Sequence, residues 1–265
     1  MKVVSLASGS GGNAYFVESG GSALLVDCGI SGRELACRCR RAGVDIGRIG
    51  AVVVTHNHID HVKGLSAVRK RLPNAAIFAN MMTAETASMV AGIEETDFAI
   101  FENGQEFQVG PFSVTAFPIP HDVPDPVGFV IRAEGVTYFH ATDVGAPLDS
   151  IGTRLAEADV ATLESNHDPV MLARSSRAES LKRRIRGPRG HLANCDSADL
   201  VRRFASRRLR KLFLAHLSQE CNTPQLAEDE MRRALADAGL GGVSLEILSQ
   251  DDPGAVWDSD GTAQC

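Results

Sequence analysis

The spacing of hydrophobic and polar residues divides this chain into short alternating segments. Apolar runs with the two-residue period of β-strands recur along it, and glycine-rich turns such as residues 8–13 separate them. The strands predicted from this pattern cover residues 2–7, 14–18, 23–27, 51–55, 76–79, 106–109, 112–117, 127–133, 136–140, 160–163, 211–215 and 244–248.

Segments with the periodicity of an α-helix lie between many of these strands. The predicted helices cover residues 32–42, 62–71, 82–91, 148–156, 175–185, 197–207 and 224–238, and Pro73 ends the second of them. Residues 98–140 form a run of strands, whereas the rest of the chain alternates strand and helix. We therefore expect an α/β (α+β) fold with two mixed sheets and helices on their outer sides.

The C-terminal segment differs from the rest of the chain in composition. Residues 250–265 are acidic, contain glycine and are weakly apolar, which predicts a mobile tail. Trp257 is the exception, because its side chain could dock on the folded body. We therefore place one folded domain at residues 1–249 and a mobile acidic tail at residues 250–265.

The bulk composition is that of a soluble globular protein. The chain has 265 residues, of which 44% are hydrophobic and 23% are charged. We see no apolar run long enough to span a membrane and no signal peptide, so we expect no membrane association and a cytoplasmic location. The six cysteines form no C-x-x-C pair, which favours reduced thiols over disulfides.

The charge is distributed unevenly. The net charge is −6, but residues 174–211 contain 13 Lys and Arg against 3 Asp and Glu, a local balance of +10. The remainder, with 14 basic and 30 acidic residues, carries −16. This asymmetry predicts one basic face on an acidic body, suited to binding phosphates, although an arginine-rich solvated surface would give the same count.

One segment concentrates residues that bind metals. The apolar run at residues 52–54 leads into His56, His58, Asp60 and His61, so three imidazoles and a carboxylate lie within six residues. His56 and His58 share one face of an extended segment, and Asp60 and His61 follow where the chain turns. Imidazole and carboxylate are ligands for zinc and related divalent ions, and one loop of this kind can serve two ions.

Further candidate ligands follow other predicted strands. His121, Asp143 and His216 each come just after a strand, and Asp27 ends the strand at residues 23–27. A dinuclear site requires more ligands than one loop supplies, which favours a ligand role for His121 and His216 over a structural one. Two ions a few ångströms apart are suited to the hydrolysis of phosphate or acyl bonds.

The order of these residues resembles the five ligand motifs of metallo-β-lactamase-fold hydrolases. The resemblance implies a four-layer αβ/βα sandwich with the site between its two sheets. It also implies one metal ion on His56, His58 and His121, a second on Asp60, His61 and His216, and a bridging Asp143. Asp27 would orient a ligand. We expect two divalent ions, Zn²⁺ or Mn²⁺, and iron accepts the same ligand types.

Additional segments are similar to the YycJ/WalJ-like branch of this superfamily. They are residues 8–13, 163–168, 190–194 and 216–222. This resemblance implies a bacterial cytoplasmic protein linked to DNA metabolism. The implied activity is a metal-dependent 5′-to-3′ exonuclease on double-stranded DNA, which uses a hydroxide that bridges the two metal ions.

Candidate roles in this reaction extend beyond the ligands. We expect Asp60 to orient the nucleophile, and either His191 or His167 to protonate the leaving oxygen. The candidate substrate-binding residues are Lys182, Arg183, Arg184, Arg186, Asn166 and Asn194. Because only 5% of residues are aromatic, recognition through phosphate and shape is favoured over base stacking.

Three alternatives use the same fold. A small-molecule hydrolase, such as a cyclic phosphodiesterase or a thioesterase, would have a small buried pocket and no affinity for DNA. An RNA-processing nuclease is equally compatible with the ligands. A metal-binding regulatory protein without turnover is disfavoured, because every expected ligand is present. The lack of a secretion signal, together with Asp60, also disfavours β-lactam hydrolysis.

Overall fold

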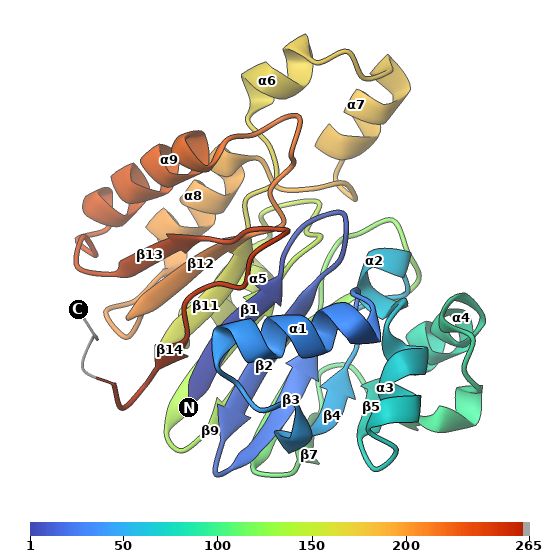
Figure 1. The fold of residues 1–265 in the computed structure, drawn as a ribbon. Helices are drawn as coiled ribbons and strands as arrows, with labels where there is room; N and C mark the ends of the chain where they lie inside the picture. The colour runs from blue at the N-terminus through green and yellow to red at the C-terminus, as the bar shows by residue number, and fades with distance from the viewer. Residues whose placement is uncertain (262–265) are drawn as a thin grey trace.

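Two seven-stranded β-sheets pack face to face in the computed structural model, which describes residues 1–261 (Figure 1). The first sheet has the order β14 (Trp257–Asp258), β1 (Lys2–Ala7), β2 (Ala14–Ser19), β3 (Ser22–Val26), β4 (Ile49–Val53), β5 (Ala76–Ala79) and β6 (Phe98–Ile100). The second has the order β13 (Ser244–Ile247), β12 (Lys211–Ala215), β11 (Val160–Glu164), β10 (Val136–Ala141), β9 (Val127–Ala133), β8 (Phe112–Pro118) and β7 (Glu106–Val109).

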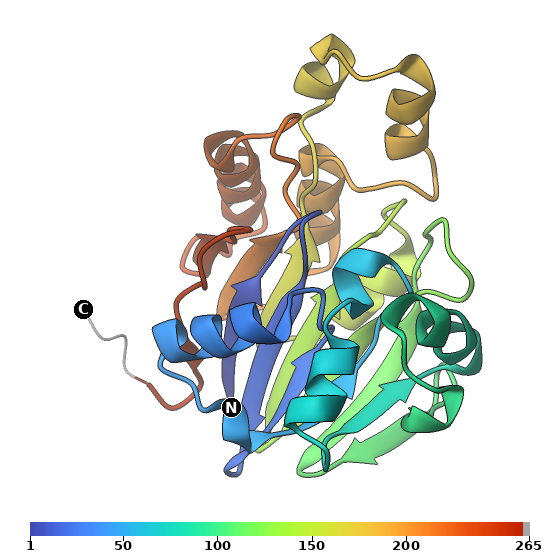
Figure 2. The same ribbon diagram turned by 45° about the vertical axis from the view of Figure 1, so that its right-hand side comes forward.

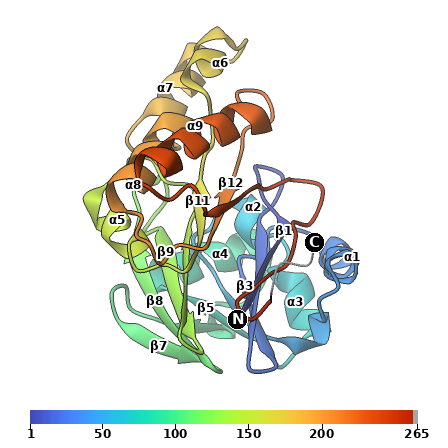
Figure 3. The ribbon, with the colours of Figure 1, turned by 90° about the vertical axis from the view of Figure 1, so that its left-hand side faces the viewer.

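Helices cover the outer side of each sheet. Helices α1 (Gly32–Ala42), α2 (Ile59–Val62), α3 (Leu65–Arg71) and α4 (Met81–Ala91) belong to the first half, and α5 (Asp149–Leu155), α8 (Asn194–Phe204) and α9 (Pro224–Asp237) to the second. Figure 3 shows α1 and α3 on one side of the molecule and α5 on the other, with the strands between them. The expected four-layer αβ/βα architecture is therefore confirmed.

Each sheet is apolar on both faces because it is covered on both. In β2, Tyr15 and Val17 face the opposite sheet, whereas Phe16 packs with the helices of the first half. The inner layer also holds Phe112, Phe129 and Tyr138, each with an exposed fraction below 2%. Because this layer contains side chains from both sheets, it holds the two sheets against each other.

Parallel strands bring the candidate site together. Strands β3, β4, β5 and β6 run parallel to one another in the first sheet, as do β10 to β13 in the second. The carboxyl ends of neighbouring parallel strands lie at the same edge of a sheet, which is where α/β proteins place their ligands. The residues that follow β3, β4, β10 and β12 therefore emerge close together.

Two helices form an arm that stands away from the sandwich. Helices α6 (Pro169–Arg174) and α7 (Glu179–Arg186), which we call the arm, project beyond the edge that carries the strand ends (Figure 2). Leu172 and Ile185 pack with Cys221 in a small apolar cluster that attaches the arm to the body. The arm interrupts an otherwise regular alternation of strand and helix.

The structure departs from two predicted helices. The helix expected at residues 62–71 is broken into α2 and α3, since Gly64 packs against backbone, and a Cβ there would lie 2.2 Å from the Ile30 oxygen. The helix expected at residues 175–185 begins only at Glu179, and α6 before it was not predicted. Asp168 caps α6 by accepting from the Met171 N–H at 2.7 Å, and Pro169 begins it.

The C-terminal segment makes defined contacts as far as the structure describes it. β14 pairs antiparallel with β1, and the guanidinium of Arg210 lies 5.3 Å from the centre of the Trp257 ring. The domain division at residue 249 and the mobility of the tail stay predictions, and residues 262–265 lie outside the described part. Among residues 1–261, no helix has the length and apolar character needed to cross a membrane.

Candidate metal centre

The candidate ligands leave their strands through an uncommon backbone conformation. Asp27, Asp143 and His216 follow β3, β10 and β12, and their φ angles are +59°, +59° and +57°. The left-handed region is unfavourable for residues with a Cβ, and such residues cluster at functional sites. At all three positions this turn ends the strand and directs the side chain toward the seam between the sheets.

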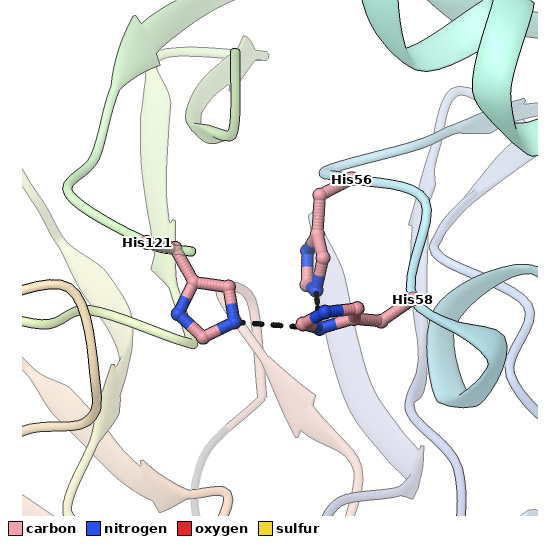
Figure 4. A group of neighbouring side chains, drawn as sticks. All are labelled: His56, His58 and His121. Atoms are coloured by element: carbon pink, nitrogen blue, oxygen red, sulfur yellow. Dashed lines mark hydrogen bonds between the residues drawn. The ribbon is translucent and has the colours of Figure 1, made fainter. Parts of the chain in front are cut away.

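Three histidines form a first cluster. The Nε2 atom of His56 lies 3.1 Å from Nδ1 of His58, and Nε2 of His121 lies 3.4 Å from the same atom. Figure 4 shows the three rings pointing toward one another from two separate loops. Three imidazole nitrogens within 4.8 Å of one another match the donor set of a divalent-ion site.

Asp60, His61 and His216 form a second cluster beside the first. Oδ2 of Asp60 lies 3.6 Å from Nε2 of His61 and 3.8 Å from Nε2 of His216. Asp143 lies between the clusters, with Oδ2 at 3.1 Å from Nε2 of His61 and Oδ1 at 3.8 Å from Nε2 of His121. The sequence-predicted ligands are thus brought together in the two predicted groups.

The chemistry of these side chains fits divalent ions. Nε2 of His216 and Oδ2 of Asp143 are buried and have no hydrogen-bond partner within residues 1–261. Buried polar atoms without a partner are costly, and a coordinated cation would satisfy both. The donor set of this His and Asp cluster is therefore suited to divalent metal.

Two buried carboxylates orient histidines of the second cluster. Oδ2 of Asp27 lies 2.7 Å from Nδ1 of His61, and Oε1 of Glu164 lies 2.9 Å from Nδ1 of His216. Each carboxylate accepts the Nδ1 proton, which leaves Nε2 free to face the cluster. Asp27 was predicted to orient a ligand, whereas Glu164, in the segment 163–168, was not predicted to take such a role.

Glu164 also holds His191 at the edge of the site. Its Oε1 lies 2.9 Å from Nδ1 of His191, and its Oε2 accepts from the Val144 N–H at 2.7 Å. Burial raises the pKa of Glu164, but the charge of His191 and the hydrogen bonds from both histidines outweigh it and lower the pKa to about 2. Glu164 therefore stays ionised and serves two histidines.

Burial and charge divide the histidines into two groups. Burial lowers the pKa of His56, His58 and His121, which keeps these rings neutral. Burial also opposes protonation of His216, but the charge of Asp143, the nearby Asp60 carboxylate and the hydrogen bond to Glu164 outweigh it and raise its pKa to about 10. A first cluster of neutral donors thus adjoins a second one rich in negative charge.

The glycine-rich loop of residues 8–13 supports the histidine loop. The Asn13 N–H donates to the Asp60 carbonyl at 2.8 Å, and Nδ2 of Asn13 lies 3.1 Å from Nε2 of His61. Gly29 packs so closely on this loop that a Cβ would lie 1.5 Å from the Asp60 oxygen. The sequence marked residues 8–13 as a glycine-rich turn but did not single out Asn13.

A cleft of about 210 Å³ opens over the clusters and extends to the arm. His58, Asp60, Asp143, His191 and His216 line its floor, together with Asn166, whose Nδ2 donates to the His216 carbonyl at 2.7 Å. His167 and Asn194 do not line this cleft. Asn194 is buried in hydrogen bonds to Ser165 and Asn222, and burial lowers the pKa of His167 to about 4.

The predicted substrate-binding residues of the arm differ in position. Lys182 is buried, and its ammonium group donates to the Ala173 carbonyl at 2.9 Å and pairs with Glu179 at 3.1 Å. Arg183, Arg184 and Arg186 are all exposed to solvent, and of these three Arg184 lines the cleft. Lys182 is therefore placed to stabilise the arm, and the arginines are placed to meet a ligand.

The basic segment does not form one face, contrary to the sequence-based expectation. Arg208 and Lys211 lie at the start of β12, the opposite end from His216, where they pair with Asp159 at 3.1 Å and Glu246 at 2.7 Å. By contrast, Arg174, Arg183, Arg186 and Arg189 have no carboxylate within 4.0 Å among residues 1–261. Four arginines on and beside the arm thus lack a carboxylate partner in the described residues, as do Arg207 and Arg210 near the start of β12.

Comparison with known proteins gives a family match over most of the chain. The beta-lactamase superfamily domain matches residues 23–216. The chain is 31% identical over 246 residues to exodeoxyribonuclease WalJ of Streptococcus pneumoniae, which covers 91% of each chain. It is 32% identical over 248 residues to exodeoxyribonuclease YycJ of Bacillus anthracis, which covers 93% of this chain and 94% of that one.

A solved structure agrees with this match at the level of the fold. The metallo-beta-lactamase fold protein YhfI from Bacillus subtilis superposes with a TM-score of 0.68 at 20% identity, over 97% of this chain and 98% of that one. The agreement extends over both sheets and their helices.

Proposed function

The chain belongs to the metallo-β-lactamase superfamily of metal-dependent hydrolases, in the branch that includes WalJ and YycJ, and on this premise we propose that it is a two-metal exonuclease that degrades double-stranded DNA from the 5′ end. Relatives named exodeoxyribonuclease, similar over nine-tenths of the chain, support a nuclease. The observation that carries the two-metal proposal is the pair of adjacent clusters with Asp143 between them.

The ligand assignment follows the two clusters. His56, His58 and His121 would hold one ion, Asp60, His61 and His216 the other, and Asp143 would contact both. When bound, two divalent ions lower the pKa of water and offset the charge that develops on the phosphate oxygens. Asp27 and Glu164 keep the histidines of the second cluster in the tautomer that points Nε2 inward.

Two further side chains act directly on the reacting groups. The Asp60 carboxylate faces the cleft between His61 and His216, where it orients the attacking water. His191 lies in the cleft wall with Nδ1 tied to Glu164, so its Nε2 is the atom that gives a proton to the leaving oxygen. His191 is preferred to His167 because only His191 lines the cleft.

The charge of the arm favours a polymeric substrate over a small molecule. Its exposed arginines, Arg174, Arg183 and Arg186, together with Arg189, carry charge that no carboxylate neutralises within residues 1–261. Such side chains contact the phosphates of a nucleic-acid backbone without reading its bases. A small-molecule hydrolase would have no use for this charge outside its pocket.

The proposal is tested by digesting a 5′-labelled linear DNA duplex in the presence of Mn²⁺, with His58→Ala as the matched inactive variant. Release of short 5′ products by the wild type alone is the expected result. Digestion of RNA but not DNA of the same sequence would redirect the assignment to RNA processing. No digestion of either polymer, with two ions bound per chain, would reject a nuclease in favour of small phosphodiesters or thioesters.

A further inference from the structure

The segment that follows β13 returns to the glycine-rich loop of residues 8–13. Residues 249–258, which we call the C-terminal strap, include β14 and run beside β1 (Figure 1). The Ser249 carbonyl accepts from the Ser8 N–H at 3.1 Å, and the Ser5 carbonyl accepts from the Gly254 N–H at 2.9 Å. The strap is thus hydrogen-bonded both to β1 and to the first residue of the glycine loop.

Gln250 binds the glycine loop through its side-chain amide. Its Oε1 accepts from the Gly11 N–H at 2.6 Å, and its Nε2 donates to the Gly12 carbonyl at 2.9 Å. A Cβ on Gly9 or Gly11 would lie 2.7 or 2.9 Å from Oε1, so Gln250 fills the space that a side chain would take there. One amide therefore fixes two neighbouring residues of a loop that glycine would otherwise leave free to adopt many conformations.

Gln250 is itself held by a buried arginine of α1. Arg38 is 8% exposed, and its Nη1 donates to the Gln250 carbonyl at 2.6 Å and to the Leu6 carbonyl at 3.1 Å. Arg41 of the same helix pairs with Asp252. A guanidinium group is costly to bury unless its N–H groups find acceptors, and the strap provides one of them. The strap therefore contributes to the packing of the body, and its position is fixed at Gln250.

The glycine loop contacts each candidate ligand of the second cluster. Oγ of Ser8 accepts from the His216 N–H at 2.8 Å. The Asn13 N–H donates to the Asp60 carbonyl at 2.8 Å, and Nδ2 of Asn13 lies 3.1 Å from Nε2 of His61. Asp60, His61 and His216 are thus all joined to the loop that the strap holds.

The first cluster is not joined to the loop in this way. Among residues 1–261, no hydrogen bond connects residues 8–13 or the strap with His56, His58 or His121. Asn13, by contrast, is tied into the loop, because its Oδ1 accepts from the Gly9 N–H at 3.0 Å and its Nδ2 donates to the Gly9 carbonyl at 3.1 Å. A change in the conformation of the loop therefore acts directly on the second cluster alone.

We propose that Gln250 is a positioning residue of the second metal site, acting through the glycine loop, and this inference rests on the two-ion assignment proposed above. With Gln250 in place, Ser8 and Asn13 are ordered before an ion arrives. Without it, the ion has to order the loop as it binds, and its affinity falls because conformational entropy is lost at that step. The strap is thereby part of the metal centre, although none of its residues lines the cleft.

The test titrates metal-free protein with Mn²⁺ by calorimetry, which gives the affinity of each ion. Gln250→Ala is expected to weaken binding of the second ion by about 10- to 100-fold, as the loss of a group that orients ligands does, and to leave the affinity for the first unchanged. Gln250→Met keeps the length of the side chain without its hydrogen bonds and should weaken the second ion as much; recovery of affinity in this variant would overturn the proposal. Asp251→Ala, at the adjacent exposed residue, should retain both affinities.

Amide hydrogen exchange of the metal-free protein provides a readout that does not involve the ions. The Gly11 N–H loses its acceptor in Gln250→Ala, so exchange should accelerate at residues 8–13 and in the histidine loop at residues 56–61. Exchange in both sheets should stay as slow as in the wild type and in Asp251→Ala. Acceleration throughout both sheets would overturn the proposal, because Gln250 would then act on stability in general.

The outcomes separate this inference from the function on which it rests. Wild-type affinity for the second ion in Gln250→Ala would overturn the positioning role and leave the two-ion assignment intact. An equal loss of affinity for both ions would also overturn it, since the glycine loop contacts only the second cluster. A wild type that binds a single ion would overturn the two-ion assignment together with this inference.

Discussion

At the scale of single residues, the centre depends on groups that hold the candidate ligands as much as on the ligands. Asp27 and Glu164 each fix one imidazole of the second cluster through Nδ1. Their position after strands β3 and β11 is visible in the sequence, but which histidine each one meets is not. The parallel pairing of β11 with β12 in the second sheet brings Glu164 to His216, 52 residues further along the chain.

Replacing Glu164 by Gln tests this orienting role. The amide carries no negative charge, and its NH2 group cannot accept from the Val144 and Leu192 N–H groups that donate to Oε2, so we expect metal affinity or activity to fall by about 10- to 100-fold. Metal content after dialysis against a limiting metal concentration measures the effect, with Glu157→Gln on the surface as the control. Unchanged affinity and turnover would show that His216 orients itself without Glu164.

Gly29 supports the centre through the absence of a side chain. A Cβ there would lie 1.5 Å from the Asp60 oxygen, so Gly29→Ala must displace the histidine loop. We expect a loss of about 3 kcal/mol or more in unfolding free energy, with lower metal content. Urea denaturation measures this, and Gly50→Ala, where a Cβ meets nothing within 4 Å, is the control. Equal stability of the two variants would contradict the close approach.

At the scale of elements, local signals predicted some segments well. Helix α1 spans Gly32–Ala42 as expected, because Ser31 and Glu34 form a capping box and Gly43 ends the helix in the left-handed conformation. Strand β12 at Lys211–Ala215 also matches, since its apolar run is bounded by charged and polar residues. The break between α2 and α3 was not predictable, since it arises from Gly64 packing against a distant turn.

The capping box of α1 gives a prediction at this scale. Ser31→Ala removes the hydroxyl that caps Glu34 N–H and should cost about 1 kcal/mol in unfolding free energy. Hydrogen bonds from Ser31 also lower the pKa of Glu34, so its contribution is present at neutral pH and is lost as the pH falls through that lowered pKa. Denaturation at neutral and acid pH should show that the loss in unfolding free energy caused by Ser31→Ala is smaller in acid. Ser180→Ala, at an exposed position, is the control. A penalty independent of pH would exclude Glu34 as the partner.

At the scale of the whole molecule, the number of basic residues in a segment indicates a binding surface only once their positions in the fold are known. Residues 174–211 contain an excess of basic over acidic residues, but this count combines the basic residues of the arm with those near the start of β12, which the fold separates. Arg208 and Lys211 neutralise Asp159 and Glu246 far from the cleft, whereas Arg174, Arg183 and Arg186 of the arm have no carboxylate partner among residues 1–261. A sequence gives the sum of charges and their order, while only the fold gives their distances.

The exposed arm arginines yield a prediction for DNA binding. Replacing Arg183 and Arg186 by Gln should weaken duplex binding and flatten its salt dependence, by about 1 unit of slope for each phosphate that is no longer neutralised. Binding titrations over a range of salt concentrations measure the slope. Arg232→Gln with Arg233→Gln on α9, which pair with Glu228 and Glu230, provides the control. Equal effects of the two double variants would remove the arm from the binding surface.

The last candidate ligand, His216, lies late in the chain and far from the histidine loop that opens the site. Strand β12, which carries it, pairs with β11 before it and with β13 at Ser244–Ile247 after it. During synthesis on the ribosome, a growing chain therefore lacks a complete centre until almost all of it has been made. A fragment that ends before β12 has the first cluster but cannot close the second, so an unfinished copy lacks the two-metal centre proposed above.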